Sequence, residues 1–143
     1  MQTFLPYSDF VQSAKVLDYR RLGKQRVEAM QLVNSTLKIE ASPDTKVGWA
    51  NHPARTMWSG WLPALKFYHN VVIQEWIDRG YNNNMKMYEL PDTIEMPSWL
   101  GEGSPVHISH RSNLLRKDPV YYSQFGWDES PNIEYYWPSK AIM

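Results

Sequence analysis

The chain has 143 residues, no cysteine and a formal net charge of zero at pH 7. The lack of cysteine excludes a disulfide framework, a thiolate metal site and a cysteine nucleophile, and it fits an intracellular protein. A neutral total argues against a broad, non-specific DNA-binding surface, although binding depends on the local field and not on the sum. The length suits one domain with a single core, so we expect a single domain over residues 1–143.

The first residues, MQTFLPYSDF, lack the basic region and apolar run of a signal peptide. No apolar run approaches the ~20 residues that a membrane-spanning helix needs. We therefore expect a cytoplasmic protein without a membrane partner.

The apolar spacing predicts helices from the start of the chain. Ser8 or Asp9 can cap a first helix, and a second helical stretch continues to about Leu37. Gly23 lies where we expect a bend or a close contact between helices. Residues 39–51 are predicted to form a loop.

The next segment contains the clearest helix. Asn51 is suited to cap a short helix with Pro53 in its first turn. A long amphipathic helix is predicted from about residue 63 to residue 79, and Gly80 follows it as the expected stop. The turn-rich residues 81–103 carry no predicted element.

The last part begins with another helix signal, Ser104 as a cap and Pro105 in the first position. A short fifth helical turn is predicted near residues 118–127, and the aromatic tail is expected to pack back on the body. No strand run or internal repeat is present. We predict an all-α protein, one compact domain of about four to five helices with long loops.

Positive charge is concentrated in DYRRLGKQR, residues 18–26, which carries the four cations Arg20, Arg21, Lys24 and Arg26. On a helix, Asp18, Arg21 and Glu28 share one face. An ordinary charge ladder on a solvated surface would give this pattern, and so would a wall that holds an anion. The segment alone does not separate the two interpretations.

A second cluster lies in HPARTMWSGW, residues 52–61. The start of a helix exposes unpaired N–H groups, so an anion could bind there beside His52 and Arg55. The alternative is a capped helix with Trp58 in the core, which we favour for the tryptophan.

A third cluster is HISHRSNLLRK, residues 107–117, in which His107, His110 and Arg111 lie on one helical stripe. Two histidines three residues apart could bind a metal, but no further ligand is suitably spaced, so we predict no metal site. A phosphate-binding face made by Arg111, Asn113, Lys117 and a histidine is more natural.

Three segments together carry a resemblance to a known family: DYRRLGKQR, IQEWIDRGYN (residues 73–82) and HISHRSNLLRKDPVYY (residues 107–122). The chain resembles the pyrimidine-dimer DNA glycosylases of the endonuclease V type. Residues 18–24 match the family's E-Y-R-E-L-x-R run, and residues 73–82 match a pattern like I-x-E-x-L-x-R-G-F-N. The tail, residues 135–142, matches an aromatic, Lys-Ala-Ile-containing end. The opening MQTFLPY is most similar to a bacterial and phage branch.

The resemblance implies a small all-α DNA repair enzyme of a bacterium or a phage-infected host cell, a glycosylase with β-lyase activity on damaged or modified pyrimidines. In that family the chain's own α-amine attacks C1′ and forms a Schiff base, assisted by a glutamate on the first helix. Gln2 should disfavour removal of the initiator methionine, so the amine would belong to Met1. Arg21 stands where the family has its glutamate, so Glu28 is our candidate carboxylate and Asp18 the second.

The partner implied is DNA, expected to be duplex, and neither a cofactor nor a metal is predicted. The oligomeric state is not predicted. A second hypothesis is a family relative that kept a cationic cleft for nucleic acid, a nucleotide or a nucleotide-like signal, and lost the chemistry. Under both hypotheses the residues expected to contact phosphate are Arg20, Arg21, Lys24, Arg26, His52, Arg55, His107, His110, Arg111, Asn113 and Lys117.

Overall fold

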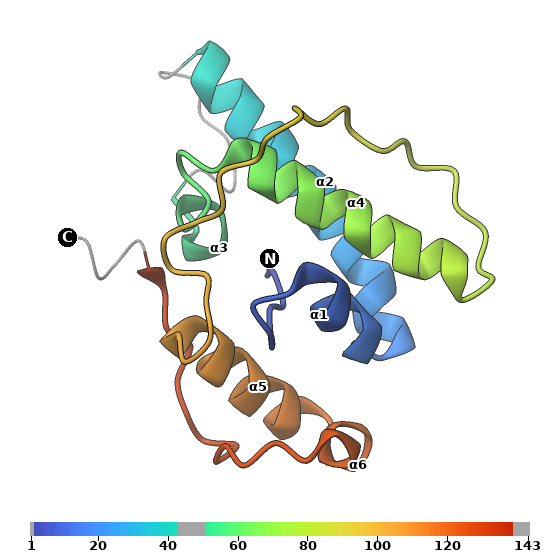
Figure 1. The fold of residues 1–143 in the computed structure, drawn as a ribbon, viewed down its shortest axis with the longest axis vertical. Coiled ribbons are helices and arrows are strands. Elements are labelled where there is room, and N and C mark those ends of the chain that lie inside the picture. Colours follow the sequence, from blue (N-terminus) through green and yellow to red (C-terminus); the bar gives the residue numbers. More distant parts are fainter. Residues whose placement is uncertain (1, 43–50, 139–143) are drawn as a thin grey trace.

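The computed structural model describes residues 2–42 and 51–138 (Figure 1). In chain order the helices are α1 (Phe10–Val16), α2 (Tyr19–Ala41), α3 (Pro53–Thr56), α4 (Leu62–Asp78), α5 (Pro105–Lys117) and α6 (Pro119–Tyr122), and a 3₁₀ turn follows at Ser123–Phe125. The described residues contain no strand. The predicted all-α fold is confirmed.

The chain bends between α1 and α2. It does not bend at Gly23, which was one of the two alternatives expected there. Leu17 and Asp18 separate the two helices, and the Asp18 carboxylate accepts a hydrogen bond from the Arg21 N–H as the cap of α2. Gly23 lies inside α2, where an added Cβ would come within 3.2 Å of the Trp76 ring. The other expectation, a close contact, is therefore correct: a Cβ at this position would be in a tighter contact with the indole than side chains usually make.

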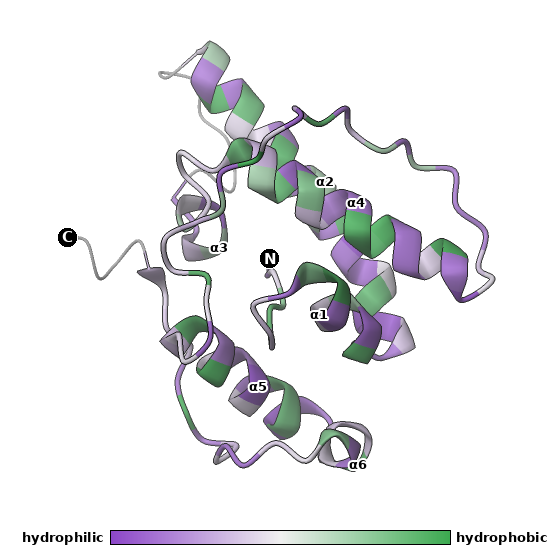
Figure 2. Cartoon of the chain, viewed as in Figure 1, coloured by the Kyte–Doolittle hydropathy of each residue, from purple (hydrophilic) through white to green (hydrophobic). Residues whose placement is uncertain are grey.

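The long helices α2 and α4 pack side by side and supply much of the core (Figure 1). Apolar and polar residues are interspersed along α2, as expected of a helix that buries one face and exposes the other (Figure 2). The buried side chains of the pair include Leu22, Ala29, Leu32 and Val33 from α2 and Leu65, Tyr68 and Val72 from α4.

Arg79, directly after α4, ties that helix to the end of α1. Its Nη2 donates to the backbone carbonyls of Ala14, Lys15 and Leu17 at 3.2, 3.0 and 2.8 Å, and its Nε pairs with Glu75 at 2.8 Å. The last carbonyl oxygens of a helix lack hydrogen-bond donors within the helix, and the Arg79 guanidinium supplies such donors here.

Two helix starts depend on the proline signals in the sequence. Ser104 caps α5 as predicted, because its Oγ accepts from the Val106 N–H. The cap of α3 is His52 and not Asn51, since the His52 Nδ1 accepts from the Ala54 N–H at 3.0 Å. Residues 81–103 form neither helix nor strand, as expected.

The N-terminal segment, defined as residues 2–6, forms neither helix nor strand and lies between α5 on one side and α2 and α4 on the other (Figure 1). The tail returns along α5, where the Tyr136 N–H donates to the Ser109 Oγ at 3.1 Å and the side chains of Tyr136 and Trp137 pack against the core. The expected packing of the tail is thus confirmed for its described part. Among the described helices, none has the length and apolar character to cross a membrane.

Candidate functional site

A cleft of about 780 Å³ opens where the N-terminal segment and the described part of the tail meet α2. It is called the α2 cleft below. Its lining combines cations, acids and aromatic rings: Gln2, Phe4, Asp18, Arg20, Arg21, Lys24, Glu28, His52, Lys117, Asp118, Tyr135 and Trp137. The volume lies within the range typical of ligand-binding pockets.

One stripe of α2 forms the main wall of the cleft. Residues three or four apart on a helix share a face, so Arg21, Lys24 and Glu28 line the cleft together. Arg20 borders the same space. The charge ladder seen in the sequence therefore faces a cavity and not open solvent.

Glu28 is in direct contact with the beginning of the chain. Its Oε2 accepts a hydrogen bond from the Gln2 backbone N–H at 3.1 Å. Gln25, one turn earlier, holds the same segment, because its Nε2 donates to the Gln2 carbonyl at 2.7 Å and its Oε1 accepts from the Phe4 N–H at 2.8 Å. Met1, the predicted nucleophile, lies outside the described residues.

Asp18, the second candidate carboxylate, is engaged in structural contacts. The Tyr122 hydroxyl donates to its Oδ1, and the Arg21 Nη1 pairs with the same oxygen at 3.0 Å. Burial acts to raise the pKa of Asp18, but the hydrogen bonds from Tyr122 and Arg21 outweigh it and lower the pKa below the ordinary value. A carboxylate held in this way is a poor proton acceptor.

Lys117, at the end of α5, closes the cleft from the other side. Its Nζ lies 5.3 Å from the centre of the Phe4 ring and 5.8 Å from that of Tyr135. Burial lowers the pKa of Lys117, and the charges of Arg21 and Arg116 lower it further. Cations crowded in this way repel one another, and a bound anion would relieve the repulsion.

His52 reaches the cleft from the start of α3. Its ring meets that of Trp137 edge to face, with 6.3 Å between the ring centres. Burial lowers its pKa, which favours the neutral imidazole near pH 7.

Two other predicted phosphate ligands do not line the cleft. Arg26 lies on the opposite face of α2, where its guanidinium stacks 4.1 Å above the Trp76 ring and donates to the Asn83 Oδ1. Arg55, on α3, donates to the Ser59 Oγ.

The predicted phosphate-binding face of α5 is a packing surface. His107, His110 and Asn113 are buried, and the Asn113 Nδ2 donates to the carbonyls of Ser109 and Ile133. Arg111 makes a bidentate pair with Glu129, at 2.9 and 2.8 Å. The structure thus gives these side chains packing and pairing contacts that differ from the expected phosphate-binding face. Of this helix, only Lys117 lines the cleft.

The buried histidines predict a loss of stability in acid. Burial, with the charges of His107 and Lys117, lowers the pKa of His110 from 6.5 to about 3, and burial also lowers the pKa of His69 and of His107. The folded pKa lies below the unfolded one, so the stabilisation is complete above pH 6.5 and is lost as the pH falls toward about 3. His110 alone should remove about 2 kcal/mol of unfolding free energy between about pH 6.5 and about pH 5, measured by urea denaturation. An unfolding free energy that stays constant over this interval would contradict the assignment.

Several cleft residues were not identified from the sequence. Gln2, Phe4, Tyr135 and Trp137 lie at the ends of the chain, where no helical spacing connects them with α2. The many aromatic residues of the tail could have indicated a role in binding. Only the fold, however, shows that two of them lie in the cleft. Among the described residues, no group of three or more potential ligands is arranged to hold a metal ion.

The matched region in a comparison with known protein families covers the α2 wall of the cleft. A sequence model of the pyrimidine dimer DNA glycosylases matches residues 1–89, which include α1 to α4 and the α2 wall of the cleft. No curated protein and no solved structure matches significantly. The matched part, more than half of the chain, shows that this protein belongs to the pyrimidine dimer DNA glycosylase family.

Proposed function

We propose that the protein is a DNA glycosylase with β-lyase activity that acts on damaged or modified pyrimidines in duplex DNA through the α-amine of Met1. The observation that carries this proposal is the contact between Glu28 and the Gln2 N–H, at 3.1 Å. It connects a carboxylate of the cleft with the residue next to the proposed nucleophile. An α-amine, with a pKa of about 7.7 to 8.0, is partly neutral and nucleophilic near pH 7.

The proposed reaction follows from the chemistry of an amine at C1′. The amine nitrogen forms a bond to C1′ while the bond from C1′ to the base breaks, and the electron pair leaves with the base, which takes up a proton. Glu28 accepts the proton that the amine gives up. The sugar ring then opens as O4′ takes up the proton that Glu28 received, leaving an iminium ion. The Glu28 carboxylate then accepts a C2′ proton, the C3′–O bond breaks with its electron pair on oxygen, and the 3′ phosphate departs.

The lining of the cleft supports a nucleotide as the ligand. Arg20, Lys24 and Lys117 offer cations for phosphates, and Tyr135 and Trp137 offer rings on which a base can stack. An enzyme that acts at C1′ of a duplex must bring the nucleotide out of the stack, and a pocket of this size and polarity can receive it. A cleft lined by both cations and aromatic rings suits a nucleotide, which has phosphates and a base, better than it suits a simple inorganic anion.

Borohydride trapping on a duplex with one abasic site tests the proposal. We expect a covalent adduct, and mass spectrometry of its peptides should place the sugar on residue 1. Blocking the α-amine by acetylation should abolish the adduct and leave binding intact. DNA binding without any adduct would contradict the proposal and favour the inactive relative, whereas an adduct through Lys117 would move the nucleophile to the other side of the cleft.

A further inference from the structure

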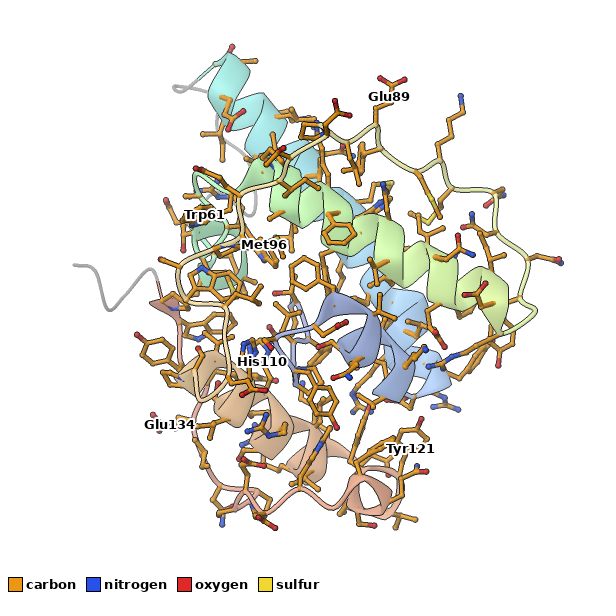
Figure 3. All side chains as sticks on the ribbon, in the orientation of Figure 1. Trp61, Glu89, Met96, His110, Tyr121 and Glu134 are labelled. Carbon is orange, nitrogen blue, oxygen red and sulfur yellow. The ribbon has the colours of Figure 1, made fainter. Side chains whose placement is uncertain are left out.

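The two histidines of α5 hold one buried residue of the N-terminal segment from both sides. Leu5 is fully buried and has no strand beside it to pair its backbone. Its N–H donates to the His110 Nδ1 at 2.8 Å, and its carbonyl oxygen lies 2.8 Å from the His107 Nδ1. Figure 3 places His110 between α5 and the segment. The two rings thus satisfy backbone groups that burial would otherwise leave unpaired.

The hydrogen bonds require opposite tautomers of the two rings. The His107 Nε2 accepts from the Gly101 N–H at 3.2 Å, so its Nδ1 carries the hydrogen and donates to Leu5. The His110 Nδ1 accepts, so its hydrogen is on Nε2. Both rings must be neutral, because a second proton on either would face a backbone N–H.

A series of hydrogen bonds connects Leu5 with the cleft through the N-terminal segment. The Phe4 N–H donates to Gln25 and Tyr68, and the Tyr68 hydroxyl donates back to the Phe4 carbonyl at 2.8 Å. Beyond Phe4, the hydrogen bonds of Gln25 and Glu28 to Gln2 fix the end of the segment. A displacement of Leu5 would therefore change the position of the Gln2 N–H relative to Glu28.

We propose that His107 and His110 are positioning residues, which together form a histidine clasp that holds Leu5 and thereby sets the position of the chain's amine relative to Glu28. The inference rests on the proposed function, since it assigns the clasp a role in that reaction. A reacting group displaced by about 1 Å can lose about 100-fold in rate, so the placement of an amine on an extended segment needs rigid support.

The burial of His110 favours this role over simple space filling. Its Nε2 is buried and has no hydrogen-bond partner among the described residues. An apolar side chain would fill the same volume without that unsatisfied donor. Burying the imidazole here costs stability unless its Nδ1 makes a required hydrogen bond. The Leu5 N–H is the donor of that hydrogen bond.

Two variants test the clasp. His110→Leu removes the acceptor, whereas His110→Asn keeps an amide oxygen that can accept from Leu5 at nearly the position of Nδ1. Under single-turnover conditions with saturating abasic duplex, His110→Leu should slow adduct formation by about 10- to 100-fold, with DNA affinity within about twofold of wild type. His110→Asn should restore most of the rate. Equal rates for all proteins, or a parallel loss of rate and affinity in His110→Leu, would overturn the positioning role.

A spectroscopic measurement on the unaltered protein covers the case in which the leucine variant does not fold. Long-range ¹H–¹⁵N spectra at neutral pH should show the hydrogen on Nδ1 of His107 and on Nε2 of His110, and the Leu5 amide should exchange slowly. The same tautomer in both rings would overturn the clasp itself. If the tautomers are opposite but the wild-type protein forms no adduct, the proposed function fails, and with it the catalytic role of the clasp.

Discussion

Replacing Glu28 with glutamine is expected to slow cleavage of abasic duplex DNA by about 10²- to 10⁴-fold in single-turnover measurements, with little change in DNA affinity. Glutamine keeps an amide oxygen for the hydrogen bond from the Gln2 N–H, so the segment should stay in place. What is lost is the carboxylate that accepts a proton from the amine. A loss of this size with unchanged binding would identify Glu28 as the assisting group.

Asp18→Asn is the matched control, since it neutralises the other candidate carboxylate, which caps α2 and also lines the cleft. Its contacts with Tyr122 and Arg21 give it a structural role, so the variant should be less stable but slowed by less than about tenfold. If Asp18→Asn loses activity and Glu28→Gln keeps it, the two assignments must be exchanged.

Replacing Arg20 and Lys24 together by glutamine should weaken duplex binding by about 10- to 100-fold at moderate salt. Each cation that neutralises a phosphate adds about one to the slope of log affinity against log salt concentration, so the double variant should reduce that slope by about two. Both side chains are exposed at the cleft and make no ion pair with another described residue, and their removal should leave the fold intact. Fluorescence anisotropy over a series of salt concentrations measures both quantities.

Lys86→Gln supplies a control for the loss of a positive charge away from the cleft. Lys86 is exposed in the loop after α4 and does not line the cleft. Its variant should bind DNA with nearly the wild-type affinity and salt slope. A double cleft variant that behaves like Lys86→Gln would show that DNA binds to another surface.

The sequence predicted the helices well because their start and stop signals are local. Ser104 with Pro105 begins α5, and the long apolar pattern near residue 63 becomes α4. The DYRRLGKQR stretch likewise predicted a cationic face, and most of that face lines the cleft. A charged stripe could be recognised from spacing, although spacing did not show whether it faces solvent or a cavity.

The surroundings of the polar stripe of α5 could not be predicted from the sequence, for a physical reason. A stripe of histidine, arginine and asparagine is polar, and polar stripes are usually exposed. Here the neighbour of that stripe is backbone outside any helix or strand, which needs hydrogen-bond partners and can bury polar side chains at low cost. Spacing along one helix contains no information about such a distant backbone, so it cannot predict the contacts of His110 and Arg111 with residues 5 and 6.

The clasp also has a consequence for the order in which the molecule folds. The bond from Leu5 to His110 joins residues 105 positions apart, and the one from Leu5 to His107 spans 102. Such closures cost more entropy than helix contacts and tend to form late. α1, α2 and α4 can pack while α5 is still detached, leaving the cleft without its opposite wall. The α5 wall of the site should therefore be among the last parts to assemble, and the time at which the Leu5 amide becomes protected during refolding should report that step.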